Sequence, residues 1–94
     1  MESNNRPYRI KFTHNGEKGY DKLQKTIYAN AIKRALNDIS LNPFQGPNIS
    51  KLSGVINQYK YRVGKYRIIY EIFEEELVVE ITEIDSRGQV YKNL

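Results

Sequence analysis

Residues 59–70 read YKYRVGKYRIIY, and this stretch decides the fold. Two runs in which apolar and charged side chains alternate flank the dipeptide Gly64-Lys65. Such alternation is typical of half-buried strands, and a glycine at the first central position suits a two-residue hairpin turn. The stretch therefore predicts two antiparallel strands, over residues 59–63 and 66–73, with Arg62 directly opposite Arg67.

A third strand is expected at residues 76–84, after a loop formed by Glu74 and Glu75. This register predicts three cross-strand pairs: Ile72 with Leu77, Tyr70 with Val79, and Ile68 with Ile81. One face of the three strands then collects only apolar and tyrosine side chains: Tyr61, Val63, Tyr66, Ile68, Tyr70, Ile72, Leu77, Val79 and Ile81. A slip of one residue would mix the two faces, so this agreement supports both hairpins.

The preceding part of the chain predicts a strand, a helical segment and a loop. Residues 7–13 alternate as a half-buried strand does. Residues 17–41 change to apolar spacings of three and four, the pattern of an amphipathic helix, which Asn15 could cap. The segment could be one long helix or two; we favour a helical hairpin, with Thr26 as the cap of the second helix. Asn42-Pro43 ends it, and residues 44–54 read as a loop.

These elements predict an α+β fold in one domain, residues 1–94. An N-terminal strand, a helical hairpin and a three-stranded antiparallel meander would form one sheet, with the helices on one of its faces. A chain of 94 residues can bury one modest core. It has no cysteine and one histidine, which excludes a disulfide scaffold, a thiol nucleophile and a multi-histidine metal cage.

The apolar runs are too short to span a membrane, and no apolar stretch near the N-terminus has the form of a secretory signal, so we expect a cytoplasmic protein. The formal net charge is +4, and four of the fifteen Lys and Arg residues lie in residues 59–70, which contain no acid. The rest of the chain is balanced. A local positive patch of this kind predicts a polyanionic partner.

The register places that charge on the outer face of the sheet, away from the helices. The predicted outer face contains Lys60, Arg62, Arg67, Ile69, Glu71, Val78, Glu80 and Thr82. Two arginines directly opposite each other repel, and a broken local rule is where a functional site is expected. The planar fork of an arginine matches phosphate oxygens. The alternative is an ordinary solvated face on which Glu71 or Glu80 neutralises the arginines.

The sequence resembles the RelE/ParE superfamily of bacterial and archaeal toxins, and the RelE branch is the closer match. The resemblance rests on three segments: Lys51-Leu52-Ser53-Gly54, residues 59–72, and residues 87–91 with Arg87, Val90 and Tyr91. It implies a toxin that enters the ribosomal A site and cuts messenger RNA there. In such toxins the 2′-hydroxyl of the RNA attacks the adjacent phosphate without a metal or another cofactor, and a RelB-like antitoxin holds the toxin inactive.

The resemblance also implies roles for five residues. Lys60 and Arg62 match the two basic positions of the family's second strand, and Arg67 matches the arginine that contacts the scissile phosphate. Arg87 matches the arginine proposed as general acid, and Tyr91 matches the tyrosine that stacks on a base of the codon. Stacking combined with phosphate contacts suits single-stranded RNA.

One departure from the family concerns the general base. Arg62 stands where the best-known member has a lysine credited with that role, and an arginine stays protonated at physiological pH. Arg62 would then act only electrostatically. Lys60 is a candidate for the base, Glu80 and Glu83 are weaker ones, and a group of the ribosomal RNA could also assist.

Two rival functions remain open. A ParE-like inhibitor of DNA gyrase is a binding protein without nuclease chemistry, but such members usually lack the full set of basic and tyrosine residues. A non-catalytic RNA-binding module would explain why Arg62 replaces a lysine. His14, the one histidine, has no partner histidine and is more typical of a surface residue. Five tyrosines are expected to pack in the core: Tyr8, Tyr20, Tyr61, Tyr66 and Tyr70.

Overall fold

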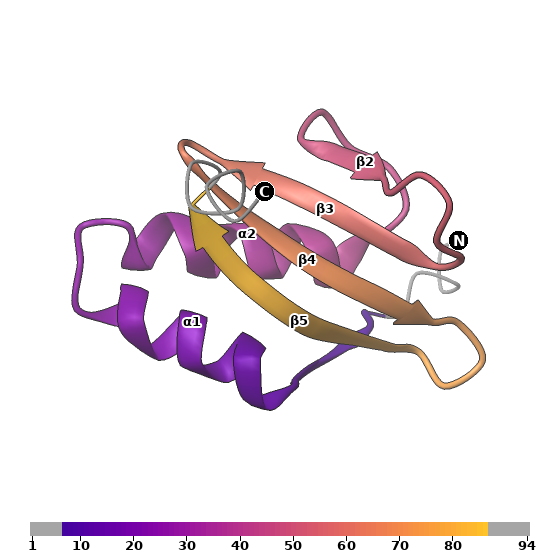
Figure 1. Cartoon of the computed structure of the whole chain (residues 1–94). Coiled ribbons are helices and arrows are strands. Elements are labelled where there is room, and N and C mark those ends of the chain that lie inside the picture. Colours follow the sequence, from indigo (N-terminus) through magenta and orange to yellow (C-terminus); the bar gives the residue numbers. More distant parts are fainter. Residues whose placement is uncertain (1–6, 87–94) are drawn as a thin grey trace.

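The computed structural model describes residues 7–86. The helices are α1 (His14–Gln24) and α2 (Ala29–Leu41). The strands are β1 (Arg9–Phe12), β2 (Ile49–Lys51), β3 (Gln58–Val63), β4 (Tyr66–Phe73) and β5 (Val78–Ser86). They form one sheet in the order β1-β5-β4-β3-β2, in which β1 is parallel to β5 and the other neighbours are antiparallel (Figure 1). The predicted α+β class is confirmed.

The β3–β4 hairpin has the predicted register. Val63 pairs with Tyr66 across the turn, and Arg62 pairs with Arg67. Gly64 has a φ of +56°, a conformation that residues with a side chain rarely adopt, which explains why the tight turn falls here.

The predicted register of β5 is wrong. The chain turns over residues 74–77, where the N–H of Leu77 donates to the carbonyl oxygen of Glu74 (3.2 Å) and Leu77 has a φ of +56°. Ile72 therefore pairs with Val79 instead of Leu77. No glycine marks the position of positive φ, so the wider turn has no signal in the sequence. The shift at this end is two residues, which leaves Val79 and Ile81 on the apolar face.

A β-bulge changes the pairing further along the same two strands. Tyr70 pairs with Ile81 but Ile69 pairs with Glu83, so Thr82 is the extra residue on β5. The Thr82 hydroxyl donates to the carbonyl oxygen of Ile69 (3.2 Å) and stabilises the irregularity. Beyond the bulge Ile68 pairs with Ile84, and the predicted pair of Ile68 with Ile81 is wrong.

β2 lies inside the segment that was expected to be a loop. Its three residues are too few to show alternation, and turn-forming residues surround them. Ile49 pairs with Tyr61, so β2 extends the sheet on the outer side of β3. The sheet therefore has one strand more than the sequence predicts.

The two-helix alternative is confirmed, but both predicted caps differ. The N-cap of α1 is Thr13, whose Oγ1 accepts a hydrogen bond from the N–H of Gly16 (3.1 Å). Asn15 already lies within the helix. Thr26 lies in the linker, where its hydroxyl donates to the carbonyl oxygen of Leu23 (2.7 Å), so it closes α1 and does not cap α2.

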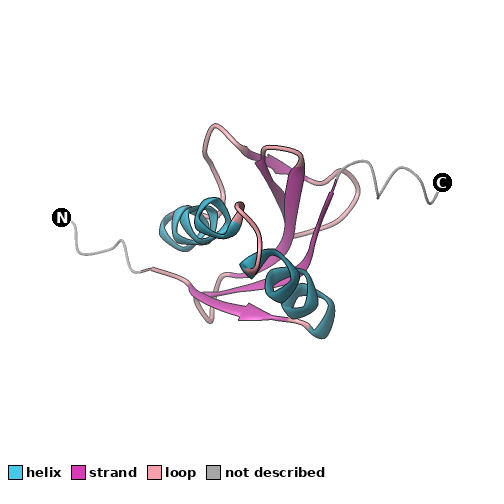
Figure 2. Ribbon diagram, turned by 90° about the vertical axis from the view of Figure 1, so that its left-hand side faces the viewer, coloured by secondary structure: helices cyan, strands magenta, loops and turns pink. Residues whose placement is uncertain are grey.

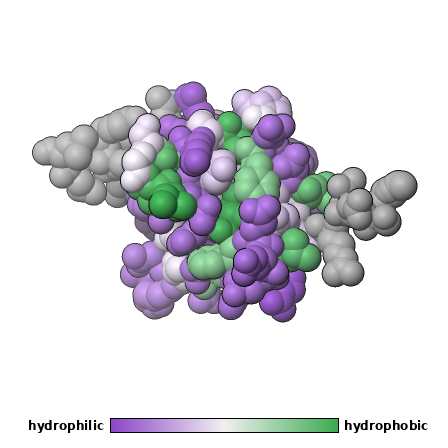
Figure 3. Space-filling model, turned by 90° about the vertical axis from the view of Figure 1, so that its right-hand side faces the viewer, coloured by the Kyte–Doolittle hydropathy of each residue, from purple (hydrophilic) through white to green (hydrophobic). Residues whose placement is uncertain are grey.

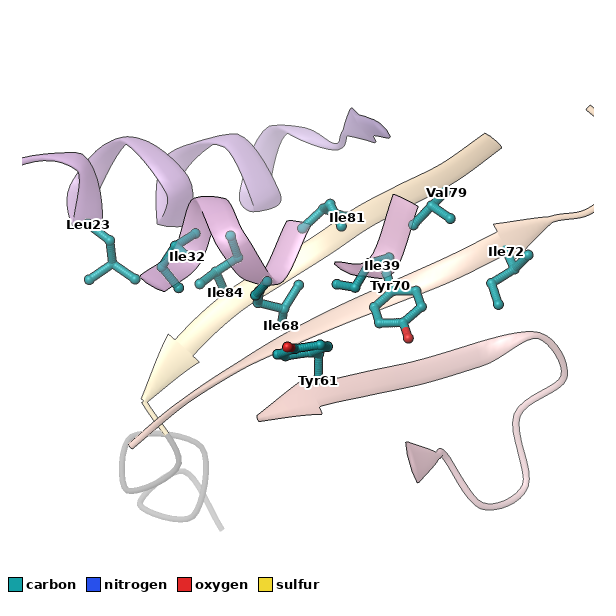
Figure 4. Close-up of a cluster of buried hydrophobic side chains, with 11 residues drawn as sticks. Leu23, Ile32, Ile39, Tyr61, Ile68, Tyr70, Ile72, Val79, Ile81 and Ile84 are labelled. Atoms are coloured by element: carbon teal, nitrogen blue, oxygen red, sulfur yellow. The ribbon is translucent and has the colours of Figure 1, made fainter. Parts of the chain in front are cut away.

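Both helices pack on the same side of the curved sheet, and the core lies between them and the strands (Figure 2). Figure 4 shows its apolar side chains converging from both layers. The core consists of Leu23, Ile32, Ala35, Ile39, Tyr61, Ile68, Tyr70, Ile72, Val79, Ile81 and Ile84. α1 lies directly against β5, because Gly16 and Gly19 present no side chain to the backbone carbonyls of Ile81 and Ile84.

The surface is mixed in character. Figure 3 views the end of the molecule at the β4–β5 turn, where hydrophilic residues surround several separate apolar spots. Within residues 7–86, no helix is long and apolar enough to cross a membrane.

Candidate nucleic-acid interface

Three basic side chains lie together on the face of the sheet that the helices leave open, and we call them the basic row: Lys60, Arg62 and Arg67. Arg62 and Arg67 are direct neighbours across β3 and β4, and Lys60 precedes Arg62 by two residues on the same face. Directly opposite side chains have Cβ atoms about 5 Å apart, and diagonal neighbours about 7–8 Å. All three cationic groups can therefore reach a single phosphate.

The residues between these cations anchor the strands that carry them. Tyr61, between Lys60 and Arg62, is 8% exposed, and its hydroxyl donates to the carboxylate of Asp38 on α2 (2.7 Å). Burial, aided by this hydrogen bond, raises the pKa of Tyr61 and keeps the hydroxyl protonated as a donor. Ile68, next to Arg67, is fully buried. The basic row thus stands on a fixed part of the sheet.

Glu71 and Glu80, the acids that would neutralise the arginines on an ordinary solvated face, lie farther along the sheet. Glu71 and Glu80 pair with each other across β4 and β5, and Lys11 of β1 lies opposite Glu80 on its other side. Glu80 therefore lies between Glu71 and Lys11, and neither acid is a direct neighbour of the paired arginines.

A different carboxylate stands beside the basic row. Asp85 pairs with Arg67 across β4 and β5, so Arg62, Arg67 and Asp85 follow one another across three strands. Asp85 is half-buried, and its Oδ1 accepts a hydrogen bond from the N–H of Ser86 (2.7 Å). Sequence reasoning missed Asp85, because the wider turn at residues 74–77 shifts β5 by two residues and the bulge at Thr82 shifts it by one more, and both are needed to bring this residue opposite Arg67.

Two predicted site residues, Arg87 and Tyr91, lie outside the described residues. The last residue described on β5, Ser86, pairs with Tyr66, one position beyond the pair of Arg67 and Asp85. The roles expected of Arg87 and Tyr91 stay predictions.

The other residues considered in the sequence lie in the core or on the surface outside the basic row. The five tyrosines expected in the core do pack there, Tyr61 and Tyr70 as buried residues and the others at its margin. His14 is exposed in the first turn of α1. Lys65, at the tip of the hairpin, has its Nζ 5.7 Å from the ring centroid of Tyr28 and 5.6 Å from that of Tyr66. In the part of the chain that the structure describes, His, Asp and Glu side chains form no cluster of three that could hold a metal ion.

The chain matches a known family of proteins over most of its length. Residues 10–91 match the family model described as the ParE toxin of type II toxin-antitoxin systems, parDE. Because the match spans most of the chain, this protein is a toxin of a type II toxin-antitoxin system and belongs to the RelE/ParE family.

Individual relatives fall on the RelE side of the family. Toxin RelG of Mycobacterium tuberculosis is 31% identical over 88 residues, which cover 92% of this chain and 98% of RelG. The isolated E. coli RelE toxin superposes with a TM-score of 0.73 at 27% identity, covering 92% of this chain and 93% of RelE. The toxin in the RelBE2 toxin-antitoxin complex of Mycobacterium tuberculosis superposes with a TM-score of 0.70 at 29% identity, covering 87% and 93% of the two chains. The fold of the protein is that of the RelE toxins.

Proposed function

We propose that this toxin is a ribosome-dependent messenger RNA endoribonuclease that cuts within the A-site codon. The observation that carries the proposal is the pair formed by Arg62 and Arg67 on the open face of the sheet, with Lys60 beside them. Paired like charges are unfavourable in the free protein, but they become favourable when a phosphate lies between them. The 31% sequence identity to toxin RelG supports the same function.

The proposed chemistry uses the RNA itself as the nucleophile. The 2′-hydroxyl attacks the adjacent phosphorus, a 2′,3′-cyclic phosphate forms, and the 5′-oxygen of the next nucleotide leaves. Lys60 and Arg67 would hold the scissile phosphate and stabilise the charge that builds up on it, with Arg62 in support. Arg87 would protonate the leaving oxygen or stabilise its charge, and Tyr91 would orient a base by stacking. No step in this scheme needs a metal ion.

We further propose that a RelB-like antitoxin is the cognate partner and that the toxin arrests growth in the cytoplasm, where ribosomes are found. Similar structures include complexes of this kind, among them RelBE2 of Mycobacterium tuberculosis and the intact E. coli RelBE complex.

A ParE-like gyrase inhibitor is the second candidate, and the description of the matching family model favours it. The two functions separate in expressing cells, because a gyrase poison produces gyrase-dependent DNA breaks and leaves messenger RNA intact. The third reading, a non-catalytic RNA-binding module, predicts RNA binding with a steep salt dependence and no cut products.

Primer extension on a defined messenger in a purified translation system tests the proposal. Wild-type toxin should produce cuts in the A-site codon only when ribosomes are present. Arg67→Ala should reduce their rate roughly 10²–10³-fold, the usual effect of removing one group that stabilises the transition state. Arg9→Ala is the matched control, since Arg9 is an exposed arginine on β1 at the far side of the sheet. Equal rates for both variants, or gyrase-dependent DNA breaks without RNA cuts, would reject the endoribonuclease.

A further inference from the structure

If the toxin cleaves RNA as proposed above, the attacking 2′-hydroxyl must lose a proton. The basic row cannot take it in its charged form, because neither a guanidinium nor an ammonium group has an acceptor. Unless Lys60 acts in its neutral form, another group of the toxin or of the ribosome must accept the proton near the phosphate.

We infer that the carboxylate of Asp85 is this proton acceptor, an inference that rests on the proposed function. Asp85 lies directly opposite Arg67, so the two Cβ atoms are about 5 Å apart. A phosphate bound by Arg67 would bring its neighbouring 2′-hydroxyl within reach of this side chain. The hydrogen bond from Ser86 N–H to Oδ1 (2.7 Å) holds the carboxylate in place, and Oδ2 is the atom that takes the proton.

The two carboxylates suggested by the sequence are less well placed. Glu83 pairs with Ile69, which makes it a diagonal neighbour of Arg67, and its side chain is exposed. Glu80 pairs with Glu71 on the far side of the bulge. Asp85 is thus the described carboxylate nearest to the paired arginines.

The step balances without any further reactant. The O–H bond of the 2′-hydroxyl breaks, its proton moves to Oδ2 of Asp85, and the 2′-oxygen forms a bond to phosphorus. The bond from phosphorus to the 5′-oxygen breaks, and that oxygen takes a proton from the general acid. Hydrolysis of the cyclic phosphate is not required for the cut.

A purely electrostatic role is the alternative for Asp85. The residue faces Arg67 on β4, and on the side of α1 it lines a hollow together with Lys18, Lys22 and Glu83. The two roles predict different effects when the negative charge is removed, one on RNA binding and the other on the chemical step. An electrostatic neighbour would weaken phosphate binding, so its neutralisation would tighten RNA binding without slowing the chemical step. Loss of a proton acceptor slows the chemical step.

Single-turnover cleavage on ribosomes with a defined A-site codon separates these roles. Asp85→Asn keeps the size of the side chain and the acceptor for Ser86 N–H, and a thermal unfolding midpoint near that of the wild type shows that it folds. The rate at saturating toxin should fall about 10²–10⁴-fold, the range for general base catalysis, while the half-saturating toxin concentration should not rise. Asp85→Glu should recover part of the rate. Glu83→Gln, with the same charge change, should stay within about fivefold of wild type, because an exposed charge interacts weakly through solvent.

A substrate with a 5′-bridging sulfur provides a second measurement. A thiolate leaves without needing a proton, so this substrate rescues a missing general acid but not a missing base. Asp85→Asn should remain slow on it. The assignment would be overturned if the sulfur substrate restored the rate of Asp85→Asn. It would also be overturned if Asp85→Asn cleaved the normal substrate within about fivefold of the wild-type rate, or if Glu83→Gln lost more activity than Asp85→Asn. In each case cleavage by the wild type would leave the proposed function standing, whereas absence of cleavage by the wild type would reject both.

Discussion

Replacing Gly19 by alanine measures how closely α1 must approach the sheet. A methyl group at Gly19 would lie 2.5 Å from the carbonyl oxygen of Ile84 and 3.1 Å from the Cβ of Ile84. Ile84 lies beyond the end of the pairing between β1 and β5, but it is paired with Ile68 of β4. The obstructing oxygen is therefore backbone that cannot rotate away, and α1 must move off the sheet.

Two opposing effects set the magnitude. Alanine is a better helix former than glycine by about 1 kcal/mol, which alone would stabilise α1. Overpacking of a tight site costs about 1–3 kcal/mol, and a contact this short with backbone belongs at the upper end. We expect the free energy of unfolding to fall by about 2 kcal/mol, which lowers the melting temperature by roughly 8–16 °C in a domain of this size.

Urea unfolding followed by circular dichroism measures this change. Asn30→Ala is the control, since Asn30 is an exposed residue of α2 where alanine adds helix propensity without a clash. Gly16→Ala should destabilise at least as much as Gly19→Ala, because its methyl group would collide with the carbonyl of Ile81. A Gly19→Ala protein as stable as wild type would refute the close seating of α1 on β5.

Three further predictions concern the core and the site. The Tyr70 hydroxyl donates to the carbonyl oxygen of Pro43 in the core (2.8 Å), so Tyr70→Phe should lower the free energy of unfolding by about 1–3 kcal/mol. Tyr20→Phe should change it little, because within residues 7–86 the Tyr20 hydroxyl has no hydrogen-bond partner; equal losses in the two variants would contradict this. Burial raises the pKa of Tyr70 above its ordinary value of 10.0, so its contribution to stability is complete below pH 10 and is lost as the pH rises further. Urea unfolding between about pH 9 and 11 should show a decline approaching 1.4 kcal/mol per pH unit, smaller in Tyr70→Phe. Arg62→Lys should leave the cleavage rate within about fivefold of wild type if Asp85 takes the proton, and an increase of tenfold or more would instead assign proton removal to position 62.

The sequence was most informative where side chains alternate without interruption. The β3–β4 hairpin, its glycine turn and the opposition of Arg62 and Arg67 all follow from the pattern of residues 59–70. Period-two alternation determines which face a residue occupies, and a single glycine marked the turn. The basic row was therefore predictable as a surface, together with its position relative to the core.

The sequence was least informative where the backbone departs from regular geometry. The turn at residues 74–77 places Leu77 at positive φ, and the bulge at Thr82 inserts a residue into β5. No glycine marks the turn or the bulge in the sequence. Both irregularities depend on how β5 packs against β4, β1 and α1. Asp85 is opposite Arg67 because the turn and the bulge together shift β5 by three residues, so the alternation of side chains alone could not have predicted this pair.

The bulge therefore connects the packing of α1 with the chemistry of the open face. Gly19 lets α1 contact the backbone at Ile84, which is buried opposite Ile68. The next pair along these two strands is Asp85 with Arg67, whose side chains lie on the outer face. Lys60, Arg62, Arg67 and Asp85, the described members of the proposed site, are each next in sequence to a buried residue, so their positions are set by the core. A substitution that moves α1 off β5 should then weaken cleavage even though it touches no charged residue. If Gly19→Ala lowered stability as expected but left the single-turnover rate of the folded toxin unchanged, the position of Asp85 would not depend on the seating of α1.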